Sequence, residues 1–221
     1  MIELAIDYLR RNAPLSVALS GISFFLYHLL LRLKIILKGK SDFSIDQLPK
    51  RIARVFDEVI LHKKVASGKR KSAGILHALV MYGFIFFGLI TINHFGMAFG
   101  LPIFSDSIRH TYFLFFGAPW AILCSIGILG LAYRRFVIKP EALGKFSSTS
   151  AIVSVFIVTL MVTYLIDEFH ILSGTAEKFN WWLHSGVIGG FLFLIPQSKH
   201  MHLVLSPVSY THLTLPTILL V

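Results

Sequence analysis

The chain of 221 residues is 55% hydrophobic and only 14% charged, whereas a soluble domain is about a quarter charged, so the composition excludes an ordinary soluble fold. The single Cys124 excludes a disulfide framework and a cysteine-ligated cluster within this chain. A net charge of +10 is common among nucleic-acid-binding proteins, but the basic residues follow the pattern of a membrane orientation signal, so we expect no nucleic-acid partner.

Apolar segments long enough to cross a bilayer recur along the chain. A hydrocarbon core of about 30 Å is crossed by about 20 helical residues, and backbone in lipid must satisfy its own hydrogen bonds. The ten-residue alternation of a membrane β-barrel is missing from the sequence. We therefore predict an all-α integral membrane bundle of five transmembrane helices, at residues 14–33, 74–99, 111–133, 151–172 and 181–198.

The basic residues predict the orientation of this bundle in its membrane, which we expect to be a prokaryotic cytoplasmic (inner) membrane. Seventeen of the 21 Lys and Arg residues lie in 32–71, in 134–145 and at Lys199, which would all face one side. The positive-inside rule places that side in the cytoplasm, so the N-terminus is outside and the end of the fifth helix is inside. The opposite side carries Arg10, Arg11, Arg109 and Lys178.

The first basic loop contains a further helical pattern. Apolar residues from Ile45 to Ile60 recur at helical spacing, with basic residues between them. This pattern predicts an amphipathic helix that lies on the inner leaflet or against a cytoplasmic partner. A solvated connector is the alternative.

Histidines bracket the fifth segment. His184 and His202 are eighteen residues apart, or five turns of a continuous helix, so they share a face and lie roughly 27 Å apart along the axis. His200 is rotated by about 160° from His184, and Pro196 is able to kink the helix between them. Ionisable residues in membranes usually mark function, and imidazole is a common axial ligand of haem iron.

The second segment carries the matching histidines. His77 and His94 are seventeen residues apart, or roughly 25 Å along a helix. Because the second and fifth helices run in opposite directions, His77 would face His202 and His94 would face His184. We therefore predict two haem b groups with these four histidines as axial ligands to iron. The seventeen-residue spacing sets His77 and His94 about 100° apart around the helix, which leaves a single haem as the alternative.

Another polar cluster is predicted near the outer surface. His110 and Arg109 precede the third segment, and Glu168 and His170 end the fourth. Such groups could transfer protons or contact a quinone headgroup, and ordinary interfacial polarity is the alternative. In the fifth segment, Gly186 and Gly190 favour close approach of another helix over room for a macrocycle.

Several stretches resemble known families. "WWLH" followed by "LIPQSKHMH" resembles the last span of the gamma subunit of respiratory nitrate reductase, whose haem ligands would correspond to His184 and to His202, six residues after Pro196. "LHALVMYGF" and "AYRRFVIKPEAL" resemble the N-terminal membrane domain of iron–sulfur oxidoreductases related to heterodisulfide reductase. The histidines of the second span are more closely spaced in the nitrate reductase family than His77 and His94.

These resemblances imply an oxidoreductase domain that transfers electrons through haem b between menaquinone or ubiquinone and a cytoplasmic iron–sulfur domain or subunit. Two other functions stay open from the residues alone, namely a haem-free membrane anchor for a soluble partner and a histidine-lined metal or proton transporter. Transporters usually place their ligands near the membrane midplane, on broken helices of repeated halves. The second and fifth segments have apolar middles instead.

The end of the chain departs from this pattern. "PVSYTHLTLPT", at 207–217, resembles the translation of a transposase sequencing adaptor. We therefore expect residues 1–206 to form the cytochrome b-type membrane domain, and 207–221 to be a foreign tail in place of a cytoplasmic region. On this interpretation His212 has no function.

Overall fold

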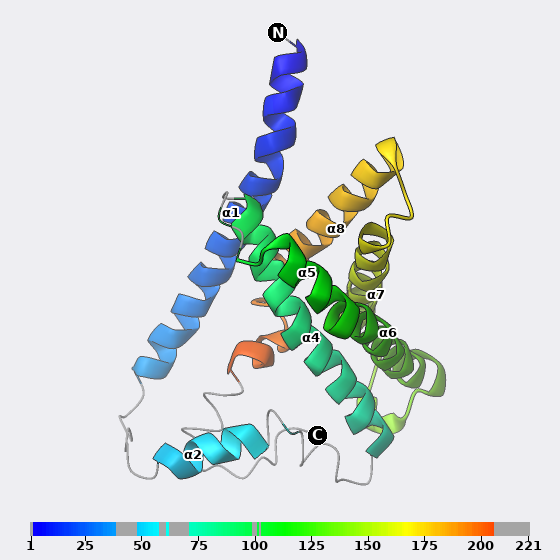
Figure 1. Cartoon of the computed structure of the whole chain (residues 1–221). Helices are drawn as coiled ribbons and strands as arrows, with labels where there is room; N and C mark the ends of the chain where they lie inside the picture. Colours follow the sequence, from blue (N-terminus) through cyan, green and yellow to red (C-terminus); the bar gives the residue numbers. More distant parts are fainter. Residues whose placement is uncertain are drawn as a thin grey trace.

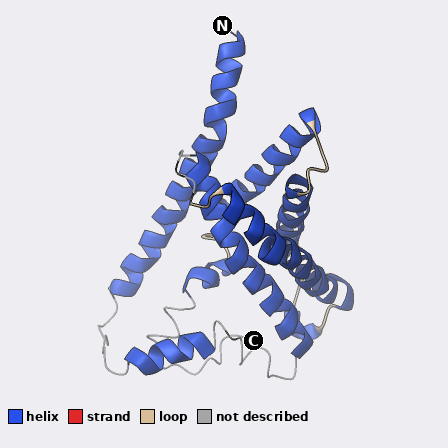
Figure 2. Cartoon of the chain, viewed as in Figure 1, coloured by secondary structure: helices blue, strands red, loops and turns tan. Residues whose placement is uncertain are grey.

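The computed structural model describes residues 2–38, 48–57, 61, 71–98, 101 and 103–205, and this part of the chain is helical, with no strand (Figures 1 and 2). Short segments of π-helix and 3-10 helix accompany the α-helices. The α-helices are α1 (Ile2–Leu37), α2 (Leu48–Val55), α4 (Lys71–Ala98), α5 (Asp106–Tyr112), α6 (Ala118–Tyr133), α7 (Ser148–Glu168) and α8 (Gly174–Leu194). The shorter segments are η2 (Phe113–Gly117), η3 (Arg134–Ile138), η4 (Glu141–Leu143) and η5 (Lys199–Met201).

Four helical stretches are long and apolar enough to cross a membrane: Leu19–Leu37, Lys71–Gly96, Ser107–Ile138 and Ser148–Glu168. They correspond to the first four predicted segments, so the prediction of an all-α, multi-pass membrane protein is confirmed. Most of the predicted fifth segment, 181–198, falls in α8. This helix begins with polar turns, and it is not among the four stretches that are long and apolar enough. The count of five spans and the orientation therefore stay predictions.

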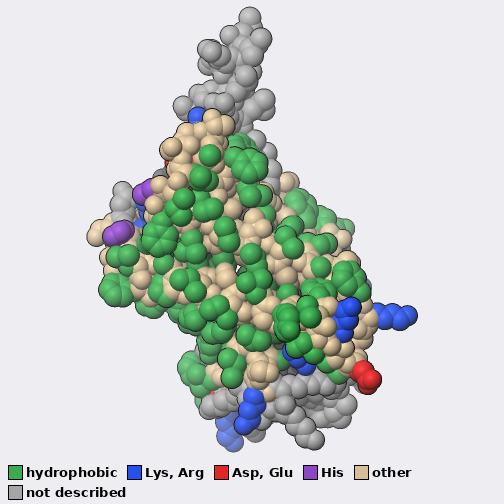
Figure 3. Space-filling model, turned by 90° about the vertical axis from the view of Figure 1, so that its right-hand side faces the viewer, with side chains coloured by type: hydrophobic (Ala, Val, Ile, Leu, Met, Phe, Trp, Pro, Cys, Tyr) green, Lys and Arg blue, Asp and Glu red, His purple; other side chains and the backbone are tan. Residues whose placement is uncertain are grey.

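The surface of the bundle suits a lipid environment. Hydrophobic side chains cover much of the face in Figure 3, whereas the Lys and Arg side chains on that face lie mostly toward its lower end. Large apolar residues on the spans are well exposed, among them Ile35 at 71% and Phe115 at 70%. In water such exposure would form an apolar patch far larger than monomeric soluble proteins tolerate. Lipid contact is the physical explanation.

The spanning helices pack in a chain of neighbours. Along this chain α4 packs on α6, α6 on α7, α7 on α8 and α8 on α1. Gly127 in α6 permits the first of these contacts, because a Cβ there would come within 2.8 Å of the Leu76 carbonyl oxygen. The buried core lies between η2, α6 and α7, and it consists of Phe113, Ala121, Cys124, Met161 and Tyr164. Cys124 therefore serves as a small buried apolar residue.

The segment after α8 corrects one step of the sequence argument. We expected a continuous helix from His184 to His202, but α8 ends at Leu194 and the chain turns before η5. Pro196, which cannot donate a backbone hydrogen bond, is fully buried in this turn. Its carbonyl accepts a hydrogen bond of 2.7 Å from Nη2 of Arg32 in α1. The phase argument over five helical turns was therefore wrong, although His202 still meets its predicted partner.

The remaining predictions on organisation have mixed outcomes. The amphipathic helix of the basic loop is present as α2 over Leu48–Val55, with Ile52 exposed, and residues 45–47 and 58–60 of the predicted pattern lie outside the described residues. The proposed foreign tail, 207–221, lies outside the described residues, and so does His62. Gly190 does allow close approach, since a Cβ there would lie 2.7 Å from the Phe156 ring, whereas a Cβ at Gly186 would meet nothing within 4 Å.

Candidate functional site: two histidine pairs and an adjoining pocket

The four predicted histidines lie in two pairs. In the first histidine pair, the rings of His77 and His202 have centroids 6.3 Å apart and planes inclined by 33°. In the second histidine pair, the rings of His94 and His184 have centroids 6.1 Å apart and planes inclined by 75°. The pairing expected from opposed helices is therefore present in the structure.

The offset of about 100° between His77 and His94 proves compatible with both pairs. Helix α4 runs unbroken from Lys71 to Ala98, so no local distortion brings these side chains to one face. Their partners instead come from different places, because His184 belongs to α8 and His202 follows the turn and η5. Because His202 lies beyond the end of α8, it does not have to lie on the same helical face as His184.

The separation within each pair matches the requirement of two imidazoles that share one metal ion. A metal–imidazole nitrogen bond is about 2 Å long, and the nitrogen lies about 1 Å from the ring centroid, so the two centroids should be about 6 Å apart. Both observed distances have this value. Each of these two pairs joins a histidine of α4 to a histidine far away in the chain.

The helices that carry the pairs also stand apart. In the described part of the chain, α4 and α8 do not pack closely against each other, although His94 on α4 and His184 on α8 approach one another. Gly88 lies eleven residues after His77, three turns along α4 and on the same face, and a Cβ there would meet no atom within 4 Å. A flat macrocycle between two helices needs such separation, so the residues present fit a haem group.

In each pair, the histidine that comes later in the chain has one ring nitrogen within hydrogen-bond distance of another group of the protein. Nδ1 of His184 lies 2.8 Å from Oγ1 of Thr163, and Nδ1 of His202 lies 2.8 Å from the carbonyl oxygen of Lys199. Metal-bound histidines almost always donate their second ring N–H to such an acceptor, which orients the ring and leaves the other nitrogen for the metal. Both rings are therefore prepared in the way a ligand requires.

A third histidine lies beside the first pair. The ring centroid of His200 is 6.2 Å from that of His202, and Nδ1 of His200 lies 3.1 Å from Oγ of Ser198. Burial, and then the nearby charges of Lys199, His202 and His77, lower the pKa of His200 to about 4, so the ring is neutral at pH 7. Two residues apart in one turn, His200 and His202 cannot approach opposite faces of a macrocycle.

The described residues contain no group of three or more His, Cys, Asp or Glu side chains placed to hold a metal ion. A zinc site needs at least three protein ligands, whereas haem needs only axial ones because the porphyrin supplies the others. A pair of histidines is therefore sufficient to hold a haem.

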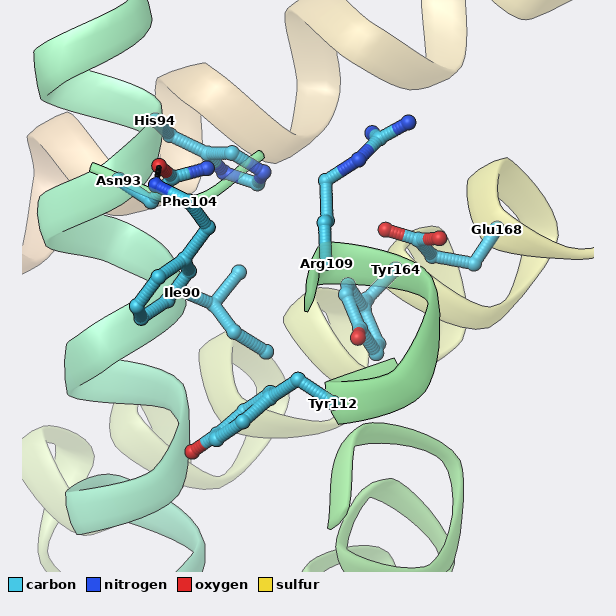
Figure 4. A pocket seen from close by; sticks show the side chains of 8 residues that line it. All are labelled: Ile90, Asn93, His94, Phe104, Arg109, Tyr112, Tyr164 and Glu168. Atoms are coloured by element: carbon cyan, nitrogen blue, oxygen red, sulfur yellow. Dashed lines mark hydrogen bonds between the residues drawn. The ribbon is translucent and has the colours of Figure 1, made fainter. Parts of the chain in front are cut away.

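A small pocket adjoins the second histidine pair, at the end of α4 (Figure 4). Figure 4 shows side chains from α4, α5 and α7 around it, with Arg109 and Glu168 on the side away from α4. The lining residues are Ile90, Asn93, His94, Phe104, Arg109, Tyr112, Tyr164 and Glu168. The pocket thus combines aromatic walls with a cation, a carboxyl group and one of the predicted haem ligands.

Three hydrogen bonds shape this pocket. Oδ1 of the buried Asn93 accepts the backbone N–H groups of Ile103 and Phe104, each at 2.9 Å, and this fixes the segment that leads into α5. The hydroxyl of Tyr112 donates to the carbonyl of Phe86 at 3.0 Å, which ties the end of α5 to α4. Arg109 is held over the pocket by the helix between these two anchors.

The predicted outer cluster is only partly assembled. Arg109 and Glu168 share the pocket, as expected from their proximity to the same surface. His110 and His170 are exposed and do not line it, although their charges, like that of Arg109, act on Glu168. His170 adopts a left-handed backbone with φ of 51° where the chain leaves α7. These two histidines are therefore placed at the rim of the site.

Sequence reasoning missed several residues of the site. The aromatic residues Tyr112 and Tyr164 are indistinguishable in sequence from the many apolar residues around them. Asn93, Thr163 and Asn180 are buried polar side chains in apolar helices, with 2%, 3% and 5% exposure. Polar groups in a membrane span are costly unless they are paired. A search for such residues in the spans could have found Asn93 and Thr163.

Comparison with known proteins gives one relative with a described activity. The chain is 29% identical, over an alignment of 225 residues, to the probable iron–sulfur-binding oxidoreductase FadF of Bacillus subtilis (strain 168). The alignment covers 87% of this chain and 31% of the relative, so the chain spans about a third of that protein's length. This similarity supports the expected relation to iron–sulfur oxidoreductases, whereas the expected relation to the nitrate reductase gamma subunit is not confirmed.

The other comparisons gave no match. No protein-family model matches the chain, and no solved structure matches it.

Proposed function

We propose that this chain is the membrane electron-transfer domain of a quinone-linked iron–sulfur oxidoreductase, with one haem b at each histidine pair. The observation that carries the proposal is that two imidazoles lie about 6 Å apart in each of two pairs, toward the two ends of α4. Haem held in this way supplies a one-electron carrier at each level. The protein orients the four rings and separates the two sites along α4.

The pocket beside the second pair is the proposed quinone site. A quinone headgroup is a flat ring with two carbonyl oxygens, which suits aromatic walls and a hydrogen-bond donor such as Arg109. The cavity of about 10 Å³ has room for about one water, so the headgroup would have to displace the lining side chains to enter. Oxidation of a quinol also releases protons, and Glu168 on the pocket wall is able to accept one. His110 and His170 at the rim would pass protons between Glu168 and water.

The relative supports the remaining part of the proposal. Because it is described as iron–sulfur-binding and is about three times as long as the matched region, the iron–sulfur centres would lie in a domain or subunit outside this chain. The single buried Cys124 cannot supply a cluster. Five spans with the basic loops in the cytoplasm would place the first histidine pair near that iron–sulfur partner, at the inner surface of a prokaryotic cytoplasmic membrane.

The test is the haem content of the purified protein. We expect a b-type reduced-minus-oxidised spectrum and about two haems per chain by the pyridine haemochrome assay. His184→Ala and His202→Ala should each remove one of them. The matched control is His28→Ala, because His28 is a half-buried histidine on a spanning helix, and its ring contacts that of Phe24 outside both pairs.

The result also separates the alternative functions. A colourless protein, made with ample porphyrin supply, would overturn the proposal and leave a haem-free anchor or a histidine-lined transporter. The quinone site is tested separately, by the concentration of a soluble quinol analogue that gives half the maximal rate of haem reduction. Arg109→Leu should raise this concentration with both haems retained, and an unchanged value would show that the pocket does not bind the headgroup.

A further inference from the structure

A hydroxyl group in α7 contacts the second histidine pair. Thr163 is buried, with 3% of its surface exposed, and its Oγ1 lies 2.8 Å from Nδ1 of His184. The backbone carbonyl of Thr163 accepts a hydrogen bond of 2.9 Å from the side chain of Asn180, one turn before His184 in α8. Side chain and backbone of Thr163 therefore both hold the helix that carries this histidine.

The hydrogen-bond network assigns the direction of the contact with His184. A hydroxyl has a single hydrogen, and that of Thr163 is directed to backbone carbonyls of its own helix, at 2.7 Å to Thr159 and 3.2 Å to Leu160. Oγ1 of Thr163 is thus left as an acceptor, and the donor must be Nδ1–H of His184. In the neutral imidazole, Nε2 then carries the lone pair.

The first histidine pair has the same arrangement with a different acceptor. The carbonyl of Lys199, 2.8 Å from Nδ1 of His202, can only accept, so Nδ1 carries the hydrogen there too. The acceptor for His202 belongs to the backbone and survives any substitution of its side chain, whereas the acceptor for His184 is a side chain. A single substitution is therefore able to change one pair and leave the other untouched.

We propose that Thr163 is a positioning residue for the second histidine pair, which fixes the Nδ1–H tautomer of His184 and strengthens Nε2 as a ligand to haem iron. This inference rests on the proposed function and adds to it a residue that selectively adjusts one haem. An acceptor on Nδ1–H increases the electron density that the ring gives to the metal, which favours the oxidised state. Loss of the acceptor should make the midpoint potential of that haem more positive.

The experiment is a redox titration of the haem-loaded protein with Thr163→Val. Changes around a metal ligand typically alter metal affinity at least about tenfold. A tenfold change in the redox equilibrium is about 59 mV for a one-electron couple. We expect two haems, with one midpoint more positive by about this amount and the other unchanged. Thr163→Ser, which keeps the oxygen, should restore the original value.

The matched control is Ser154→Ala, which removes another hydroxyl of α7 that donates to its own helix, in this case to Ser150 at 2.9 Å. It should shift neither midpoint. If Thr163→Val keeps both haems and both midpoints are unchanged, the inference is overturned while the proposed function stands. If the wild-type protein binds no haem, the proposed function fails and the role of Thr163 at haem fails with it.

A second measurement uses the wild-type protein, so it tests the inference even if Thr163→Val does not fold. Nitrogen-15 NMR of histidine-labelled wild-type protein, with the His184 signal identified by its loss in His184→Ala, reports the ring tautomer. A protonated Nδ1 supports the inference. A protonated Nε2 with a bare Nδ1 overturns it, because Thr163 could then only be a donor.

Discussion

Asn93 offers a local test of how the pocket is built. Its Oδ1 accepts two backbone N–H groups, those of Ile103 and Phe104, both at 2.9 Å, and the side chain is 2% exposed. Each such hydrogen bond contributes about 0.5–1.5 kcal/mol net. Asn93→Ala should therefore weaken the closed form of this segment by about 2 kcal/mol, or roughly thirtyfold in its opening equilibrium.

Hydrogen–deuterium exchange measures this opening at the two amides concerned. In detergent or nanodiscs, the peptide that contains Ile103 and Phe104 should exchange roughly thirtyfold faster in Asn93→Ala, and peptides of α7 should keep their rates. The matched control is Gln197→Ala, which removes an exposed amide with a 3.2 Å hydrogen bond to Phe193. Equal exchange in wild type and Asn93→Ala would refute the role of Asn93 as the anchor of the pocket.

Three further substitutions test other contacts. Arg32→Met removes the hydrogen bond to the Pro196 carbonyl, and because this bond holds the turn before the first histidine pair, haem content should fall from two toward one per chain in the haemochrome assay. His200→Ala should leave haem content unchanged, and loss of a haem would contradict the assigned pairs. Gly127→Ala places a Cβ 2.8 Å from the α4 backbone and should destabilise the bundle by about 1–3 kcal/mol, seen as a lower Tm, whereas Gly88→Ala, with nothing within 4 Å, should not.

Hydropathy predicted most of the helical framework, because the backbone of each segment in lipid must satisfy its own hydrogen bonds, whatever the other segments do. The segment predicted at 74–99 is observed as Lys71–Ala98, and that at 151–172 as Ser148–Glu168. The third segment was predicted as one uninterrupted span. It contains α5, the π-helix η2 and α6, and Gly117 within η2 lies against the Tyr164 hydroxyl. Such a local change of hydrogen bonding depends on a contact between helices and has no pattern in the sequence.

The histidine pairs could be predicted from the sequence, but the course of the chain from α8 to His202 could not. Opposed helices with histidines at matched spacing must bring them to two levels, which requires only the length of a helical turn. The end of α8 at Leu194 depends instead on the buried Pro196 and on Arg32, which is 164 residues away in the chain. Likewise, Arg109 and Glu168 were expected together, but their association with His94 in one pocket arises from the loop that Asn93 anchors.

The hydrogen bond between Arg32 and Pro196 has a consequence for biogenesis. The two groups are made far apart in time, since the ribosome adds about 5–20 residues per second. The Arg32 side chain therefore lacks this acceptor until residue 196 has been made. On the proposed function, we expect a nascent chain arrested before residue 196 to acquire at most the haem of the second pair, because His202 has not yet been made.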